Sequence, residues 1–251
     1  MIPNPIHKVL STLSIHAVRH LLMGGQACVF YGAAEFSKDC DVVVLVGQEN
    51  LQRLTAALME LQAECIAVPP FEAGFLLRGH AVHFRCRHPE ASGMRLDVMA
   101  VLRGCDPFED LWERRTTVEG PSGLHLELLS LPDLVQAKKT QRDKDWPMIR
   151  RLVETHLANT QDDPTPQRIQ FWLQQCRTPE YLIDLVRQFP EETQSLVPRR
   201  PLLAEVLRVG LDRLQQLLNE EELAERSRDR NHWLPLKQEL EQLRLGRTRR
   251  Q

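Results

Sequence analysis

The sequence has no apolar run long enough to cross a membrane, no secretory signal pattern and no paired-cysteine motif. A membrane-spanning helix needs roughly 20 consecutive apolar residues, and no stretch of the chain approaches that length. Residues 1–13 contain two prolines and no continuous apolar segment, which is not the pattern of a secretory signal. We therefore expect a cytoplasmic protein.

The chain also lacks any clear excess of charge. Its formal net charge is -2, with 42% hydrophobic and 26% charged residues, as in an ordinary globular protein. The overall charge therefore indicates no particular partner. The 6 cysteines are scattered, and several lie in or beside apolar stretches, as reduced structural thiols do. We expect no disulfide.

Several familiar motifs of catalytic chemistry are missing. The chain has no Ser-His-Asp arrangement, no Gly-x-x-x-x-Gly-Lys loop and no six-position Gly-x-Gly-x-x-Gly. Four potential zinc ligands do lie close in sequence: His80, His83, Cys86 and His88. On a strand, however, His83 would point away from the other three, and the spacing matches no familiar zinc pattern. We do not interpret them as a metal site.

Hydrophobic periodicity predicts an α+β fold, in which a mixed β-sheet flanked by helices is followed by a C-terminal all-helical domain. Helical patterns run from residue 6 into the apolar run 21–23, a possible first strand, and recur over 26–34 and from 48 onward. Further strands are expected at 41–46, 65–68, 75–78, 81–86 and 94–101, with a hairpin formed by 75–78 and 81–86.

The domain boundary is expected in a polar stretch with two prolines, residues 159–167, which has the composition of a linker. This gives a first domain at 1–158 and a helical domain at 159–251. Helices of the second domain are predicted around 171–173, 181–189, 202–223 and 233–245.

Two carboxylates, Asp39 and Asp41, stand one residue apart at the start of the apolar run 42–46. On a strand, side chains at i and i+2 share a face and lie roughly 6 to 7 Å apart, which suits divalent metal ions. Gly24 and Gly25 are expected to open a helix, where backbone N–H groups could approach a phosphate. Taken alone, Asp-x-Asp before an apolar strand is more often a turn with an Asx cap, and a Gly pair is most often a loop.

Together with Tyr31-Gly32, Ser37 and the later Arg95-Leu96-Asp97-Val98, these residues resemble the minimal nucleotidyltransferase superfamily, in the branch that includes AbiEii-type toxins. The resemblance covers about residues 21–152 and implies a nucleotidyltransferase fold. Members move a nucleoside monophosphate from a nucleoside triphosphate to an acceptor hydroxyl, using Mg²⁺ or Mn²⁺. It further implies Asp39, Asp41 and Asp97 as catalytic metal ligands.

The resemblance also implies nucleotide-binding residues. Gly24 and Gly25 would frame the phosphate-binding turn, and Ser37 stands where the family has a threonine. Asp97 could also accept the proton of the acceptor hydroxyl. The acceptor could be RNA, a protein or a small molecule, and the sequence does not distinguish between them.

This sequence departs from the family pattern at two important places. Glu35 stands where the family has an arginine, and an anion near a polyphosphate opposes binding unless its side chain faces solvent. Gly25 replaces a serine found in many of these transferases. The alternative is therefore an inactive nucleotidyltransferase-like module with a binding or regulatory role, possibly in a toxin–antitoxin pair with an antitoxin partner.

A second matching block follows the sheet. Ser130, Pro132 and Asp133 predict a helix start, and the helix is expected to carry Lys138, Arg142 and Asp145 on one face, with Pro147 ending it or starting the next helix. Related proteins have a similar string, so Lys138 and Arg142 could bind nucleotide phosphates. The alternative is a solvated helix face with an Arg142–Asp145 ion pair of little energetic value.

Overall fold

The computed structural model describes residues 4–120 and 123–248. They form two compact units. The first, here called the sheet unit, comprises the described residues within 1–30, 34–137 and 232–251, and the second, the helical unit, comprises 31–33 and 138–231. Within the described residues, no helix is both long and apolar enough to cross a bilayer.

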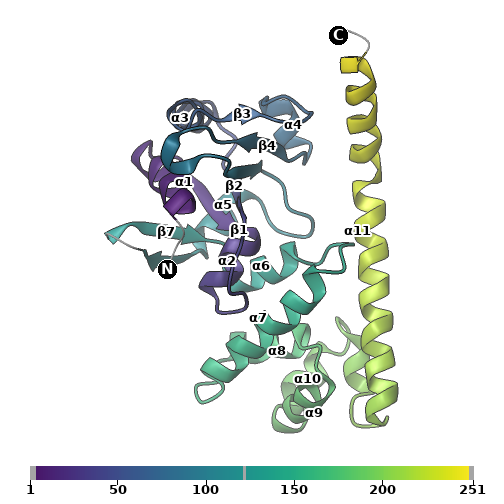
Figure 1. Cartoon of the computed structure of the whole chain (residues 1–251). Helices are drawn as coiled ribbons and strands as arrows, with labels where there is room; N and C mark the ends of the chain where they lie inside the picture. The colour runs from purple at the N-terminus through teal and green to yellow at the C-terminus, as the bar shows by residue number, and fades with distance from the viewer. Residues whose placement is uncertain (1–3, 121–122, 249–251) are drawn as a thin grey trace. The chain divides into compact units, whose positions relative to one another are not determined.

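The sheet unit contains a seven-stranded sheet in the order β3-β4-β5-β2-β1-β7-β6 (Figure 1). Two neighbouring pairs, β2 with β5 and β1 with β7, are parallel, and the other pairs are antiparallel. The strands are β1 (His20–Met23), β2 (Asp39–Val44), β3 (Glu64–Cys65), β4 (Val82–Arg85), β5 (Arg95–Met99), β6 (Thr116–Glu119) and β7 (His125–Leu128). The predicted mixed sheet is confirmed.

Helices flank this sheet, as the α+β prediction requires. They are α1 (Asn4–Ile15), α2 (Gly24–Phe30), α3 (Gln48–Glu60), α4 (Ala73–Leu77), the 3₁₀ turn η1 (Pro89–Ala91), α5 (Phe108–Glu113) and α6 (Leu131–Ala137). The apolar positions that predicted α3, including Leu54 and Leu58, are buried. Burial of one apolar helix face is what stabilises such a helix against the sheet.

Two features of the sheet differ from the prediction. Residues 75–78, expected as a hairpin strand, belong largely to α4, where Leu76 is buried and Leu77 is 61% exposed. A short apolar run does not separate a strand from a helix by periodicity alone. A hairpin of β6 with β7 was not predicted, and Leu126 and Leu128 are its buried positions on β7.

The helical unit contains α7 (Asp145–Thr160), α8 (Pro166–Gln175), α9 (Pro179–Gln188), α10 (Pro190–Leu196), the 3₁₀ turn η3 (Pro201–Ala204) and the Leu211–Asn231 part of α11 (Leu211–Thr248). Proline opens each of α8, α9 and α10, a position where its missing N–H costs nothing. The C-terminal part of the chain is all helical, as predicted.

The predicted boundary between residues 158 and 159 lies inside α7, which continues to Thr160. The two segments on either side are tied together, because the Trp172 indole donates a hydrogen bond to His156 Nδ1 at 2.9 Å. The compact units instead divide the chain between Ala137 and Lys138 and again between Asn231 and His232. The two helices expected at 202–223 and 233–245 are mostly one helix, α11, with Pro235 inside it.

Candidate functional site

The three predicted acids lie on one face of neighbouring strands. Strands β2 and β5 run parallel, with Asp41 in register with Asp97 and Asp39 in register with Arg95. Side chains two residues apart on a strand share a face, and adjacent strands are only about 4.8 Å apart. Asp39, Asp41 and Asp97 therefore form a compact acidic group at the first residues of the two strands. The opposite face of β2, with Cys40 and Val42, is fully buried.

Asp97 is the most buried of these acids, with 7% of its surface exposed. Its Oδ1 accepts hydrogen bonds from Arg95 Nε at 2.7 Å and from His83 Nδ1 at 2.9 Å. Burial raises the pKa of Asp97, but the hydrogen bonds and charges of His83 and Arg95 outweigh it, so the net pKa lies below its ordinary value. Asp97 is therefore a carboxylate at neutral pH.

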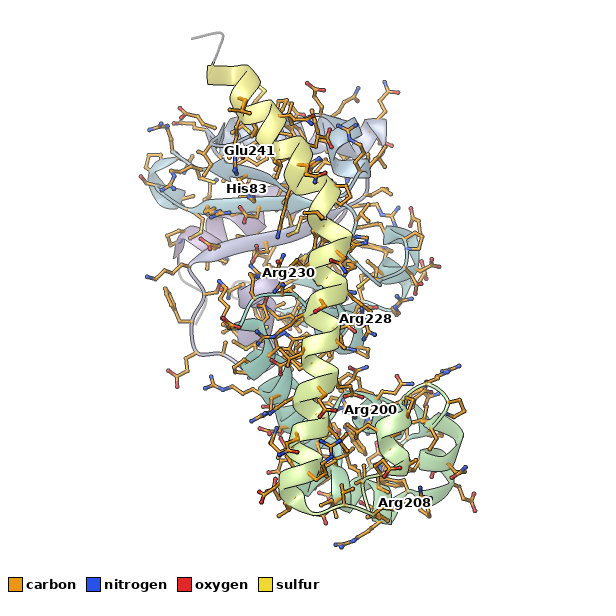
Figure 2. All side chains as sticks on the ribbon, turned by 90° about the vertical axis from the view of Figure 1, so that its right-hand side faces the viewer. His83, Arg200, Arg208, Arg228, Arg230 and Glu241 are labelled. Carbon is orange, nitrogen blue, oxygen red and sulfur yellow. The ribbon has the colours of Figure 1, made fainter. Side chains whose placement is uncertain are left out.

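Arg95 and His83 were missed as site residues in the sequence. The signal for Arg95 was its position two residues before Asp97, which places both side chains on one face of a strand. His83 stands opposite Asp97 on β4 and is labelled in Figure 2. It had been considered only with the rejected zinc ligands, because nothing in the sequence shows which residues of β4 and β5 face each other.

The Gly24 backbone lies directly against Asp41. Gly24 has a φ of +67°, and a Cβ added to it would lie 1.9 Å from Asp41 Oδ2, well inside any permitted contact. Only glycine combines this left-handed backbone with so close an approach of the carboxylate. Gly24 opens α2, as predicted, immediately after β1 ends beside the start of β2. The glycine turn and the acids are therefore one local structure.

Ser37 lies above the second glycine. A Cβ added to Gly25 would be 2.6 Å from Ser37 Oγ, so the Ser37 hydroxyl fills the space that a side chain at position 25 would need. Ser37 Oγ donates a hydrogen bond to the Asp39 carbonyl at 3.1 Å. Glu35, the residue expected to oppose polyphosphate binding, is exposed to solvent. Both departures from the family pattern thus have a local structural explanation.

The donor set fits a hard divalent cation, because all three side chains offer carboxylate oxygens. Within residues 4–120 and 123–248, however, no group of three His, Cys, Asp or Glu side chains is placed so that it could hold a metal ion together. The Asp97 carboxylate is turned toward Arg95 and His83. Completing a three-carboxylate site therefore requires Asp97 to reorient.

The second predicted cluster belongs to the helical unit and has a different form from the one expected. The prediction that one helix carries Lys138, Arg142 and Asp145 is wrong, because α6 ends at Ala137 and Asp145 begins α7. The intervening loop is held by Asp145, which accepts from Lys138 Nζ at 3.2 Å, Thr140 Oγ1 at 2.6 Å and Arg142 Nε at 2.8 Å. Pro147 lies in the first turn of α7, one of its two predicted roles.

Lys138 and Arg142 differ in what they can still bind. The Lys138 side chain is 11% exposed, whereas that of Arg142 is 58% exposed. The predicted Arg142–Asp145 ion pair is present. Burial raises the pKa of Asp145, but the charges and hydrogen bonds of Lys138, Thr140 and Arg142 lower it by more, so the net pKa lies below its ordinary value. Of the two cations, Arg142 is the more available to a ligand.

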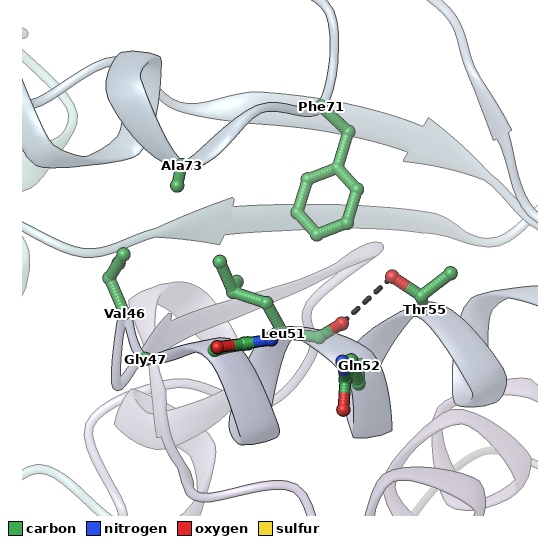
Figure 3. A pocket seen from close by; sticks show the side chains of 8 residues that line it. Val46, Gly47, Leu51, Gln52, Thr55, Phe71 and Ala73 are labelled. Carbon is green, nitrogen blue, oxygen red and sulfur yellow. Dashed lines mark hydrogen bonds between the residues drawn. The ribbon is translucent and has the colours of Figure 1, made fainter.

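A hollow of about 860 Å³ lies elsewhere on the sheet unit (Figure 3). Its lining is mostly apolar and includes Val46, Leu51 and Phe71, with the Thr55 hydroxyl bonded to the Leu51 carbonyl at 2.8 Å. Val46 lies two residues beyond the end of β2, whereas Asp39 is its first residue, so the hollow is at the other end of that strand from the acids. It is not part of the acidic site.

No family model and no curated protein matches this chain. Among solved structures, the chain is similar to one described as "putative nucleotidyltransferase from H. pylori". The match covers 90% of this chain and 94% of the other at 12% identity, with a TM-score of 0.41. At that identity and TM-score, the similarity assigns no role to any residue, and the roles have to be argued from the geometry above.

Proposed function

We propose that this protein is a metal-dependent nucleotidyltransferase that moves a nucleoside monophosphate from a nucleoside triphosphate to an acceptor hydroxyl. One observation carries the proposal: Asp39, Asp41 and Asp97 share one face of two parallel strands, with the Gly24 backbone packed against Asp41. Catalysis of phosphoryl-type transfer depends on positioning and on charge neutralisation more than on a protein nucleophile. A cluster of carboxylates beside a glycine turn meets that need.

Asp39, Asp41 and a reoriented Asp97 are the proposed ligands of Mg²⁺ or Mn²⁺. The bound ion would neutralise charge on the triphosphate and on the leaving pyrophosphate. Asp39 is the acid best placed to accept a ligand, because within the described part of the chain its carboxylate has no hydrogen bond or ion pair to another residue. Asp41 is held in place by its contact with Gly24.

The remaining site residues have proposed roles on the substrate side. Gly24 and Gly25 are proposed to frame the phosphate-binding turn, and the Ser37 hydroxyl lies beside Gly25, where related transferases have their own serine. Asp97, a carboxylate at neutral pH, could accept the proton of the acceptor hydroxyl. Arg142, and less readily Lys138, are proposed to bind phosphate oxygens.

The contacts of Asp97 also support the alternative, an inactive nucleotidyltransferase-like module with a binding or regulatory role. An acid already neutralised by Arg95 needs no metal ion for stability. In that case the acidic face of the sheet would have no catalytic role, and binding to an antitoxin or another partner would be the function of the protein. The same experiment separates the two possibilities.

The test is transfer of label from each of the four α-labelled nucleoside triphosphates, with Mg²⁺ or Mn²⁺, to cellular RNA, protein or small-molecule hydroxyl acceptors. We expect transfer to one of these classes, and Asp39→Asn should reduce it by about a hundredfold or more. Glu35→Gln is the matched control, because it removes a carboxylate from the same segment that faces solvent. Absence of both label transfer and triphosphate binding would favour the inactive module.

A further inference from the structure

Arg95 is a cation on the acidic face of the sheet, between two of its acids. It lies in register with Asp39 on the neighbouring strand, and its Nε donates to Asp97 Oδ1 at 2.7 Å. The charges of Asp97, Asp39 and Asp41 all act on its guanidinium, and the hydrogen bond that it donates to Asp97 is the largest of the causes that raise the pKa of Arg95. The arginine thus neutralises part of a concentrated negative charge.

The negative charge of these carboxylates needs a counter-ion when no metal ion is bound. Like charges on adjacent strands destabilise a sheet, and a carboxylate as buried as Asp97 is costly without a partner. The Arg95 side chain is nevertheless 39% exposed, so it can exchange Asp97 for water. A guanidinium and a divalent cation cannot both occupy the oxygen of Asp97 without strong mutual repulsion.

Resting on the proposed function, we infer that Arg95 is a built-in counter-ion of the three carboxylates, which a divalent cation must displace from Asp97 before the metal site is complete. Arg95 is therefore a positioning residue that sets metal affinity. It stabilises the protein without metal and competes with the metal for one ligand.

His83 provides the second hold on Asp97. Its Nδ1 lies 2.9 Å from Asp97 Oδ1 and 3.1 Å from Arg95 Nη2. One ring nitrogen cannot both donate to Asp97 and accept from Arg95. With the proton on Nδ1, the ring donates to Asp97 Oδ1 and its contact with Arg95 is not a hydrogen bond. His83 can then keep its bond to Asp97 Oδ1 when Arg95 leaves, so one hydrogen bond still holds the carboxylate while it reorients toward the metal ion.

Arg85 supplies a matched control. It stands in register with Arg95 on β4, on the same face of the sheet, and is exposed. Within the described residues it has no ion pair to an acid of the site. Removing Arg85 changes the charge of the face by the same amount as removing Arg95, without releasing Asp97.

The experiment measures Mn²⁺ affinity of the full-length chain by electron paramagnetic resonance of the free ion at low ionic strength. Arg95→Gln should bind Mn²⁺ roughly fivefold more tightly than the unmodified protein, the scale of a partly exposed ion pair. Arg95→Lys should restore an affinity near the original, and Arg85→Gln should change it by less than about twofold.

A second measurement covers the case in which Arg95→Gln lowers stability by leaving Asp97 without its cation. The rise in unfolding temperature on adding Mn²⁺ should then be larger for Arg95→Gln than for the unmodified chain, because ligand binding stabilises in proportion to affinity. A purely structural arginine would leave that rise unchanged.

The outcomes separate this inference from the proposed function. If the unmodified chain binds Mn²⁺ and Arg95→Gln binds it equally or more weakly, Arg95 is not a competing counter-ion, while the metal site stands. If neither the chain nor Arg95→Gln binds Mn²⁺, the metal site and the inference both fail. Binding by Arg95→Gln alone would support the inference in its strongest form.

Discussion

Asp97 in the sheet unit and Asp145 in the helical unit are both nearly buried carboxylates, 7% and 1% exposed, and each accepts from an arginine two or three residues away. Their surroundings differ. Asp97 has other acids on the same face of the sheet, including its register partner Asp41. Asp145 is surrounded by donors, with Lys138, Thr140 and Arg142 all bonded to it.

A second charged group in the helical unit follows the pattern of Asp145. Glu221 accepts from Arg200 at 3.0 and 2.8 Å and from Arg177 at 3.3 Å, and Arg177 also stacks on the Trp146 ring (Arg200 is labelled in Figure 2). Each of these groups has an opposite charge or an aromatic face beside it. We infer that charges paired in this way serve the fold, whereas the like charges gathered on one face of the sheet serve the proposed metal ligand.

The strongest test of this comparison removes one carboxylate from each unit. Asp145→Asn should lower the free energy of unfolding by about 3 kcal/mol, because Lys138 would lose its partner while remaining largely buried. Asp39→Asn should change it by less than about 0.5 kcal/mol, since the substitution relieves repulsion from Asp41. Urea-induced unfolding, monitored by circular dichroism, measures both.

Similar losses of stability in Asp145→Asn and Asp39→Asn would contradict the difference inferred between the two units. A large loss for Asp39→Asn would mean that the acidic face is held by contacts as a structural element. A negligible loss for Asp145→Asn would mean that solvent replaces the lost interactions around the loop, and the cluster would then be free to serve a ligand.

Much of the sheet unit could be predicted, because its signals are local. Asp39 and Asp41 precede a buried apolar run, and Gly24 follows a short one, so their places on β2 and α2 follow from periodicity and turn chemistry. The neighbours of Asp97 could not be predicted. They depend on the register of β5 with β2 and β4, which is set by packing between segments far apart in the chain.

The loop that carries Lys138 and Arg142 also could not be predicted from the sequence, because tertiary contacts determine its conformation. The spacing of these residues suits one helix face, but Asp145 draws their side chains into a closed loop, and Trp146 Nε1 donates to the Thr140 carbonyl at 2.8 Å. The Gln141 backbone N–H also donates to Asp229, a distant residue on α11. These tertiary bonds outweigh helix propensity, and a helical pattern does not reveal them.

A glycine pair sharpens the comparison within the sheet unit. Gly24 and Gly93 both have positive φ, +67° and +78°, but only Gly24 would place a Cβ against another residue, namely Asp41. Gly93→Ala should cost about 1 kcal/mol of stability from backbone strain alone, and Gly24→Ala about 2 kcal/mol. Gly24→Ala should in addition weaken Mn²⁺ binding, because the Asp41 carboxylate must move.

Unfolding free energies and Mn²⁺ affinities of the two variants give the answer. Equal losses of stability with unchanged Mn²⁺ affinity would show that the close approach of Gly24 to Asp41 has no part in positioning the carboxylate. The acidic face would then owe its arrangement to strand register alone.

The smallest expected effect concerns pH and the helical unit, where His156 accepts from the Trp172 indole. Burial, with a smaller effect of Arg168, lowers the pKa of His156 below its ordinary 6.5. The unfolded chain therefore takes up this proton first, and the stability of the folded state should decline as pH falls below about 6.5 toward the lowered pKa. Thermal unfolding measured between about pH 7.5 and pH 5, on both sides of the ordinary pKa of histidine, would give the slope of stability against pH.

His156→Gln keeps an acceptor for Trp172 but cannot be protonated, so it should flatten the slope of stability against pH. The substitution His125→Gln, at an exposed position, should leave that slope unchanged. An unaltered slope in His156→Gln would place the acid sensitivity in another buried group such as His20, whose pKa burial also lowers, and so in the sheet unit.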